Sequence, residues 1–377
     1  MSGSLRLPDF PWDTIAEARA TAAAHPGGIV DLSVGTPVDP TPKHIQEALR
    51  DATEAPGYPL VVGIPELRAA IRDWLKRRDF VDPGDAGVVP TTGSKEMVAW
   101  IPRMLGLGAG DIVLFPDVAY PTYEVGALLA GATPIAVDQG DVSSWPETAS
   151  LVWLNSPSNP TGQVLDREQL REAVEWTRKK GAILISDECY AELPWSPECV
   201  ENGVPSLLDE DVCGGDLYDL LIVYSLSKQS NMAGYRAAFA AGDPRIVHEL
   251  VEVRKHGGMM VPAPVQAAMV AALLDSRHVT EQRERYRVRR QMLTEALTSA
   301  GLTPQSLTEA GLYLWVAPPA DWSHMRDQSR ALLDWFAARG ILVAPGDFYG
   351  EKGTGFVRIA LTATDERIAE ACKRLRS

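Results

Sequence analysis

The 377-residue sequence lacks the patterns by which metal sites, disulfide frameworks and membrane spans are recognised. Its four cysteines form no C-x-x-C pair and have no histidine cluster near them, so we expect neither a zinc site nor disulfides. The most apolar stretch, residues 259–274, contains two prolines and is shorter than the ~18 residues that a membrane span needs. Residues 1–12 mix polar and apolar side chains, unlike a signal peptide. We therefore expect a cytoplasmic protein that holds no metal ion.

An excess of positive charge is also missing. The 36 Lys and Arg residues oppose 50 Asp and Glu residues, which gives a net charge of −14. A surface of this charge repels phosphate backbones and anionic lipid, so we expect no nucleic-acid partner and no membrane partner. An anionic substrate must then be held by a few locally placed arginines. The 45% of hydrophobic and 23% of charged residues are typical of a globular protein and exclude a disordered or fibrous one.

Short runs that are apolar throughout recur along the chain, each followed by a polar turn and a helical pattern. They include residues 112–115, 151–154, 182–185 and 221–224. Such runs are typical of strands that are covered on both faces of a parallel sheet. One helix between them is well marked, because Asp166 and Gln169 form a capping-box pattern before it and Gly181 ends it. The alternation predicts an α/β domain with a mostly parallel sheet.

The last third of the chain has a different pattern. Residues 278–300 predict one long charged helix, followed by strands at 312–316 and 356–361 with a helix at 329–339 between them. A last helix is predicted to begin at Thr364. Acidic residues are interleaved with the arginines of the long helix, which favours a solvated or interdomain face over a nucleic-acid patch. We expect a large domain at residues 41–276 and a smaller α+β domain formed by residues 1–40 and 277–377.

Polar residues gather where the apolar strands end. Asn155, Asp187 and Ser225 follow three of the runs, and residues 92–95 follow a fourth strand at 87–90 and begin a helix. Ligands of parallel α/β sheets bind outside the carboxyl ends of the strands, so these clusters predict one convergent site.

Each cluster also has an ordinary explanation. The segment Gly93-Ser94-Lys95 can offer backbone N–H groups to a phosphate, or it can be a plain helix start. Asp187 could fix a protonated ring nitrogen or cap a helix. Asn155 and Asn159 stand beside prolines, as turn-forming residues do.

Lys228 is less ordinary, because it follows a buried strand by only a few residues and precedes Arg236 by eight. With Ser225 it matches the S-x-x-K motif of penicillin-recognising serine enzymes, but no S-D-N motif occurs, and residues 352–355 have the wrong order for K-T-G. The dinucleotide-binding G-x-G-x-x-G motif is absent as well. Both of those classes are therefore excluded.

Taken together, these segments resemble the class I/II pyridoxal-phosphate aminotransferases of the aspartate aminotransferase fold. The resemblance covers nearly the whole chain and keeps the order of the motifs. The motifs are S-V-G-T-P at 33–37, Y-x4-G-x3-L-R at 58–68, N-x-P-x-N-P-T-G at 155–162, D-E-x-Y at 187–190, S-x-S-K at 225–228 with Arg236, and F-V-R-I at 356–359. The resemblance implies a three-layer sheet with helices on both faces, a pyridoxal 5'-phosphate cofactor, and a homodimer with shared active sites.

The resemblance also implies roles for single residues. Lys228 would form the Schiff base with the cofactor aldehyde and then shuttle the substrate proton. Asp187 would keep the pyridine nitrogen protonated, so that the ring accepts electrons from Cα. Asn159 and Tyr190 would bind the phenolic oxygen of the ring, and Tyr120 would stack on its face.

The remaining roles concern the two anionic groups. The phosphate would be held by Gly93, Ser94, Lys95, Ser225 and Arg236, together with Tyr58 of the neighbouring subunit. For Lys95 the backbone is the expected contact. Arg358 would bind the substrate α-carboxylate as a planar two-pronged donor, helped by Gly35 and Asn155.

Within the family, residues 7–12, 34–40 and 230–236 are similar to actinobacterial succinyldiaminopimelate transaminases. The implied reaction is that of an N-succinyl-LL-2,6-diaminopimelate:2-oxoglutarate aminotransferase in lysine biosynthesis, with glutamate as amino donor. An aminotransferase for an aromatic or aspartate-like amino acid and a C–S lyase on the same fold stay open as alternatives. A regulator with an aminotransferase-like module is disfavoured, because only about 30 residues precede Ser33.

Overall fold

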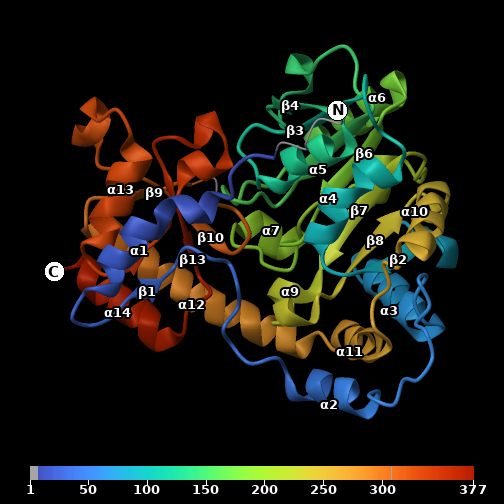
Figure 1. Cartoon of the computed structure of the whole chain (residues 1–377), viewed down its shortest axis with the longest axis horizontal. Helices are drawn as coiled ribbons and strands as arrows, with labels where there is room; N and C mark the ends of the chain where they lie inside the picture. Colours follow the sequence, from blue (N-terminus) through green and yellow to red (C-terminus); the bar gives the residue numbers. More distant parts are fainter. Residues whose placement is uncertain (1–6, 307) are drawn as a thin grey trace, which may run out of the picture.

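The computed structural model describes residues 7–306 and 308–377 and is built around a seven-stranded sheet (Figure 1). In spatial order its strands are β2 (Val88–Thr91), β8 (Ala238–Gly242), β7 (Leu220–Ser225), β6 (Ile183–Asp187), β5 (Leu151–Asn155), β3 (Ile112–Pro116) and β4 (Thr133–Val137). Neighbouring strands are parallel except in the two pairs that β8 makes. The predicted α/β class and mostly parallel sheet are therefore confirmed. Residues 1–6 of the segment without a signal-peptide pattern lie outside the described residues.

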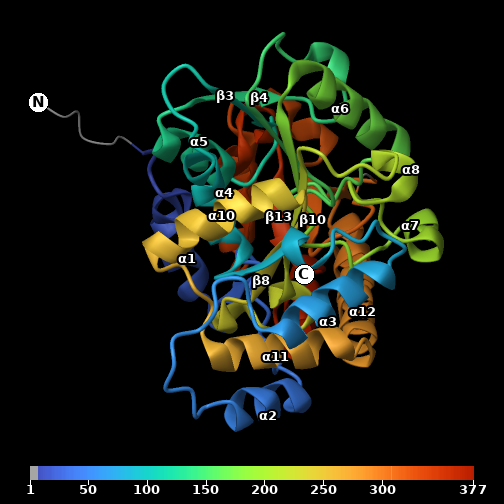
Figure 2. The same cartoon turned by 90° about the vertical axis from the view of Figure 1, so that its right-hand side faces the viewer.

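Helices cover both faces of this sheet, because strand side chains alternate between two buried clusters. On β5, Val152 and Leu154 pack with α3, α6 and α11, whereas Leu151 and Trp153 pack with α4, α5 and α10. Burial on both sides explains why this run carries no polar alternation. Figure 2 shows the sheet between the two helical layers. The helices of the first face are α3 (Pro65–Lys76), α6 (Arg167–Lys180), α8 (Glu210–Cys213) and α11 (Ala263–Leu274), and those of the second are α4 (Ser94–Met104), α5 (Thr122–Ala130) and α10 (Pro244–Gly257).

A second, smaller part combines the two ends of the chain. Its antiparallel sheet has the order β12 (Ala344–Pro345), β13 (Val357–Ala360), β10 (Tyr313–Ala317) and β9 (Thr303–Pro304). The N-terminal β1 (Val30–Asp31) pairs with β11 (Ile341–Leu342). The helices are α1 (Ala16–Ala23), α12 (Arg277–Ser299), α13 (Gln328–Ala337) and α14 (Asp365–Leu375). The domain bounds at 40/41 and 276/277 stay a prediction, with α12 beginning at the second of them.

The remaining elements are short. They are α2 (Lys43–Asp51), α7 (Pro197–Asn202), α9 (Leu226–Gln229) and the 3-10 helices η1 (Pro11–Ile15), η2 (Asp85–Gly87), η3 (Val142–Ser144), η4 (Ala233–Tyr235), η5 (Ala320–His324), η6 (Gly346–Tyr349) and η7 (Glu351–Gly353). In Figure 1, α2 lies beneath α11, against which it packs.

Local sequence signals explain where the helices begin and end. The Asp166 side chain accepts the backbone N–H of Gln169, and the Gln169 side chain accepts that of Asp166, as the capping-box pattern predicted. The helix α6 ends at Gly181, which has φ of +68°. Likewise, α14 follows Thr364, whose hydroxyl accepts the N–H of Arg367. In the part of the chain that the structure describes, no helix combines the length and apolar character needed to cross a bilayer.

Candidate active site

A cavity of about 690 Å³ lies at the carboxyl ends of β5, β6 and β7, beside the segment between β1 and α2. We call residues 34–41 of that segment the strap. Most predicted site residues line the cavity: Gly35, Ser94, Lys95, Tyr120, Asn155, Asn159, Asp187, Tyr190, Ser225, Lys228, Arg236 and Arg358. Gly93 lies against Arg236. Tyr58 is 96% exposed and does not line this cavity.

Lys228 stands in α9, directly after β7, with its partly buried side chain lining the cavity. Its Nζ donates a hydrogen bond to the carbonyl oxygen of Gly35 on the strap. Burial lowers the pKa of Lys228, and the positive charges of Arg358 and Arg236 lower it further. The site therefore favours a neutral amine, which is the form that can act as a nucleophile or a base.

Asp187 ends β6 and places a carboxylate on the floor of the cavity. Its Oδ2 accepts the hydroxyl of Tyr123 at 2.9 Å, and its Oδ1 accepts the N–H of Cys189 at 3.2 Å. Burial raises the pKa of Asp187, although these hydrogen bonds oppose the change. A cationic group bound beside this carboxylate would offset the cost of its burial.

A cationic corner lies on the other side of the cavity, where α4 begins. Gly93 precedes α4 with φ of +89°, and a Cβ there would collide with the guanidinium of Arg236. The glycine thus lets Arg236 approach the positive end of the helix dipole. Ser225 and Ser227 lie nearby, with their hydroxyls 2.8 Å apart. A helix N-terminus with an arginine is a site for a dianion such as phosphate.

Arg358 on β13 is 2% exposed and lies 3.9 Å above the ring of Tyr313. It donates from Nη1 to Oδ1 of Asn159 at 2.8 Å and from Nη2 to the carbonyl oxygen of Ser33 at 2.7 Å. No Asp or Glu among the described residues forms an ion pair with it. A buried guanidinium without a carboxylate partner is suited to a carboxylate from a ligand.

The side chain of Asn155 bonds to backbone groups of the site, whereas the sequence predicted that it contacts the substrate. Its Oδ1 accepts the N–H of Asn159 at 2.7 Å, and its Nδ2 donates to the carbonyl oxygens of Pro157 and Asp187. Both side-chain N–H groups therefore bond to backbone, and the side chain shapes the loop that presents Asn159. A direct contact between Asn155 and substrate stays a prediction.

Several cavity residues were not singled out in the sequence. They are Phe10, Trp12, Tyr123, Cys189, Ser227 and Tyr313. The hydroxyl of Tyr313 lies 3.1 Å from that of Tyr190, and a Cβ at Gly35 would collide with it. Tyr313 belongs to a strand that was predicted, but nothing in its local pattern marks it as a site residue. Tyr123 had a weak signal, since it stands three residues after Tyr120 at a helix start.

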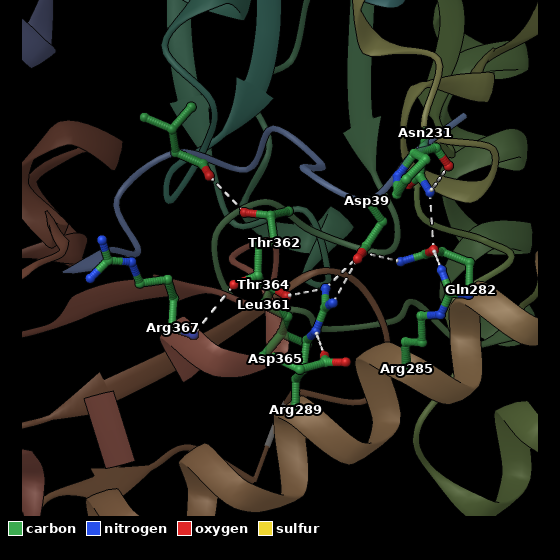
Figure 3. Close-up of polar contacts among 12 residues, drawn as sticks. Asp39, Asn231, Gln282, Arg285, Arg289, Leu361, Thr362, Thr364, Asp365 and Arg367 are labelled. Carbon is green, nitrogen blue, oxygen red and sulfur yellow. Dashed lines mark hydrogen bonds and ion pairs between the residues drawn. The ribbon is translucent and has the colours of Figure 1, made fainter. Parts of the chain in front are cut away.

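The strap is fixed by a network that Figure 3 shows. Arg289 of α12 makes two hydrogen bonds of 2.7 Å to the carboxylate of Asp39 and a third to Asp365. Gln282 donates to the same carboxylate of Asp39 at 2.8 Å. At the start of the strap, Thr362 donates to the carbonyl oxygen of Val34. The strap that carries Gly35 to Lys228 is thereby attached to α12 and to the segment after β13.

Pyridoxal phosphate carries a phosphate, a basic ring nitrogen and an aldehyde, and the cavity offers a partner of matching chemistry for each. The corner at Gly93 and Arg236 suits the phosphate, the carboxylate of Asp187 suits a protonated ring nitrogen, and the amine of Lys228 suits the aldehyde. With the three-layer α/β fold, these features define the class of pyridoxal-phosphate enzymes.

The family follows from residues 28–375, which match the model of the aminotransferase class I and II family. The chain belongs to this family, whose members depend on pyridoxal phosphate and act on amino acids and 2-oxo acids. It is an aminotransferase.

Proteins of similar sequence agree with this assignment to the family. The chain is 53% identical over 373 residues to a probable aminotransferase of Mycobacterium tuberculosis, covering 99% of the chain and 86% of the relative. It is 51% identical over 370 residues to the 4-dedimethylamino-4-oxo-anhydrotetracycline transaminase OxyQ of Streptomyces rimosus, covering 98% and 99%. An LL-diaminopimelate aminotransferase of Aquifex aeolicus is 37% identical, covering 93% and 91%.

Solved structures share the fold. A probable N-succinyldiaminopimelate aminotransferase from Thermus thermophilus superposes with a TM-score of 0.85 at 29% identity, covering 97% of this chain and 99% of that one. The aminotransferase resemblance found in the sequence is thus confirmed at the level of the family.

Proposed function

We propose that the chain transfers an amino group between N-succinyl-LL-2,6-diaminopimelate and 2-oxoglutarate, with glutamate as the donor in the biosynthetic direction. The observation that carries the proposal is a pair of cations without ion-pair partners among the described residues, Arg358 deep in the cavity and Lys95 at its mouth. Glutamate, 2-oxoglutarate and the succinylated substrate each carry a carboxylate beyond the one at Cα. The relatives that act on diaminopimelate compounds support the same substrate class.

In this proposal Arg358 binds the α-carboxylate and so orients the Cα of the substrate. Its present bond to Asn159 leaves Nε without a partner among the described residues. Lys95 lies 5.7 Å from the ring of Phe10 and 5.8 Å from that of Tyr120, where it meets the distal carboxylate. This adds a side-chain role to the backbone contact expected from the sequence.

The chemistry at Cα rests on Lys228 and Asp187. When bound, pyridoxal phosphate supplies a cationic ring that accepts electrons from Cα. The amine of Lys228 would hold the cofactor through its aldehyde carbon, with the aldehyde oxygen leaving as water. Once the substrate amine has displaced it, the freed amine of Lys228 would take the proton from Cα. Asp187, held by Tyr123, keeps a proton on the ring nitrogen. Asn159 and Tyr190 would hydrogen-bond the phenolic oxygen of the ring.

We further propose that the enzyme is a homodimer in which Tyr58 reaches the phosphate of the partner subunit's cofactor. A tyrosine that is 96% exposed in the single chain has no role within its own cavity. The neighbouring Leu60 is also about half exposed, as in a segment that another chain covers.

The relative OxyQ supports a second candidate, amination of a ring ketone. The cavity wall includes the aromatic side chains of Phe10, Trp12 and Tyr120, which could hold a flat apolar acceptor. An aromatic or aspartate-like amino acid and the C–S lyase reaction would use the same Cα chemistry.

A donor and acceptor panel tests the proposal. With glutamate as donor, we expect kcat/KM for N-succinyl-2-amino-6-oxopimelate to exceed that for aromatic oxo acids, oxaloacetate and ring ketones by about tenfold or more. Lys95→Gln should raise KM for dicarboxylic substrates and leave KM for monocarboxylic ones unchanged. Three outcomes would each contradict this substrate assignment. They are failure to use glutamate at all, faster turnover of a ring ketone, and release of pyruvate from cystathionine.

A further inference from the structure

Outside the active site, two histidines and an aspartate from three separate elements meet in one place. His44 lies on α2, Asp275 directly follows α11, and His278 lies in the first turn of α12. One potential ligand atom from each lies within 4.8 Å of the others. All three line a second cavity, of about 470 Å³.

The two histidines each present a buried nitrogen that has no hydrogen-bond partner among the described residues, Nε2 of His44 and Nδ1 of His278. His278 is only 8% exposed, and the two ring centroids are 5.2 Å apart. A buried polar atom without a partner is costly, so two of them on histidines that meet beside Asp275 need an explanation. A bound cation would satisfy both nitrogens at once.

The opposite nitrogen of His278 is already fixed, as the second coordination shell of a metal-binding histidine usually is. Its Nε2 lies 2.8 Å from Oγ of Ser230. Gln229 accepts the hydroxyl of Tyr224 with Oε1 and donates from Nε2 to the same Oγ. In the tautomer that carries the proton on Nε2, His278 donates to Ser230 Oγ and the lone pair lies on Nδ1.

Asp275 supplies the third ligand, although Arg277 also binds its carboxylate. The Arg277 side chain is 87% exposed, so this ion pair contributes little. The backbone N–H of Arg277 also donates to Oδ1, so Oδ2 is the oxygen that keeps a lone pair for a metal ion. In contrast to the sequence, from which no metal site was expected, we propose that His44, Asp275 and His278 bind a divalent transition-metal ion, with Zn²⁺ as the expected occupant. Two imidazoles and a carboxylate form a donor set that such ions prefer, and water completes the coordination.

The site has a defined place in the molecule. It links α2 and α11 to the start of α12, the helix whose Arg289 holds the strap. Through Ser230 it also contacts the segment directly after Lys228. The ion would therefore stabilise the junction beside the active site and take no part in the chemistry. Lys43 and Arg285 line the same cavity and weaken cation binding, so we expect lower affinity than in a closed four-ligand site.

The test uses the untagged, cofactor-loaded enzyme and titrates Zn²⁺ by calorimetry, with Co²⁺ as a second probe whose visible spectrum reports nitrogen and oxygen ligands. We expect one ion per chain. His44→Ala and Asp275→Asn should each weaken binding by about 100-fold, and Ser230→Ala by about tenfold. The matched control is His256→Ala, an exposed histidine on α10, which should bind as the wild type does.

Thermal unfolding and cofactor absorbance of each variant show whether it is folded, and the Co²⁺ spectrum of the wild type needs no variant at all. The proposal is overturned if the wild type binds no stoichiometric ion, if His44→Ala binds as well as the wild type, or if only His256→Ala loses binding. Binding of inorganic phosphate in place of metal, dependent on His278, would equally overturn it.

Discussion

Glu188 shows how a motif residue can serve the site without facing it. It follows Asp187, is 1% exposed, and accepts hydrogen bonds from Ser206 Oγ and the N–H of Leu207. These bonds tie the end of β6 to the loop before α8. Burial raises the pKa of Glu188 to about 8 despite the hydrogen bonds, so the carboxyl is mostly protonated at neutral pH.

This pKa predicts how stability changes with pH. The unfolded chain releases the Glu188 proton near pH ~4.3, whereas the folded chain keeps it until about 8, so this residue makes the wild type less stable as pH rises through that window. Glu188→Gln has no such proton. Urea unfolding at several pH values measures the free energy of unfolding of both proteins. The free energy of unfolding of the variant should increase relative to that of the wild type from about pH 4.5 to 8, and the difference should stay constant above pH 8.

The matched control is Glu198→Gln on the exposed face of α7, which makes the same change of side chain away from the buried site and is measured under the same conditions. A stability difference between Glu188→Gln and wild type that does not change with pH would contradict the account.

Single residues of the site were predictable where a motif carried them and not where the tertiary fold did. Lys228, Asp187 and Arg358 were found because their neighbours in sequence form recognisable patterns, although their individual roles stay predictions. Tyr313 was not found, because only the tertiary fold brings β10 beside Tyr190, which lies after β6 and far away in sequence. The sequence could not show that the amide of Asn155 bonds to backbone, and its contact with substrate stays a prediction.

Among elements, the strap has the least regular structure and depends most on side chains. Burial alone would raise the pKa of Asp39, but hydrogen bonds from Arg289 and Gln282 outweigh it and lower the pKa. Arg289 is 2% exposed, so an unpaired charge there would be costly.

Asp39→Asn should therefore destabilise the protein at neutral pH by about 2–3 kcal/mol, below the ~3–5 kcal/mol of a fully broken buried pair because Asp365 still binds Arg289. Since the folded pKa of Asp39 is depressed, its stabilisation is present above pH ~4 and is lost as the pH falls below that value. Denaturant unfolding at pH 7 and below pH 4 measures both effects.

The control is Asp365→Asn, whose carboxylate is 72% exposed and should contribute less than about 1 kcal/mol. Equal losses in the two variants, or a loss in Asp39→Asn that persists in acid, would show that the strap is held in another way.

Elements were predictable where the hydrophobic or charge pattern was clear, as in β5 and α12, and where a capping box added to it, as in α6. Two strands of the large sheet were missed for physical reasons. The strand β8 has the sequence A-F-A-A-G, which lacks the β-branched residues that favour strands. The edge strand β4 contains Pro134, which argues against a strand. The antiparallel direction of β8 depends on topology that no local pattern encodes.

For the whole molecule, the proposed shared site predicts complementation between two inactive variants. Tyr58→Ala retains Lys228 but lacks the tyrosine, and Lys228→Ala retains the tyrosine. In a mixed dimer, the site with an intact Lys228 receives Tyr58 from the partner and should recover activity, whereas neither homodimer does. Mixed dimers that form but stay inactive would place Tyr58 in the cavity of its own chain or outside catalysis.

The account depends above all on covalent attachment of the cofactor to Lys228. The most direct measurement is peptide mass spectrometry of the purified protein after loading with pyridoxal phosphate and reduction with borohydride. We predict a yellow protein that reduction bleaches, with the cofactor mass on the peptide that contains Lys228 and none on Lys228→Ala. A protein that takes up no cofactor, or a reduced label on a different lysine, would contradict the account.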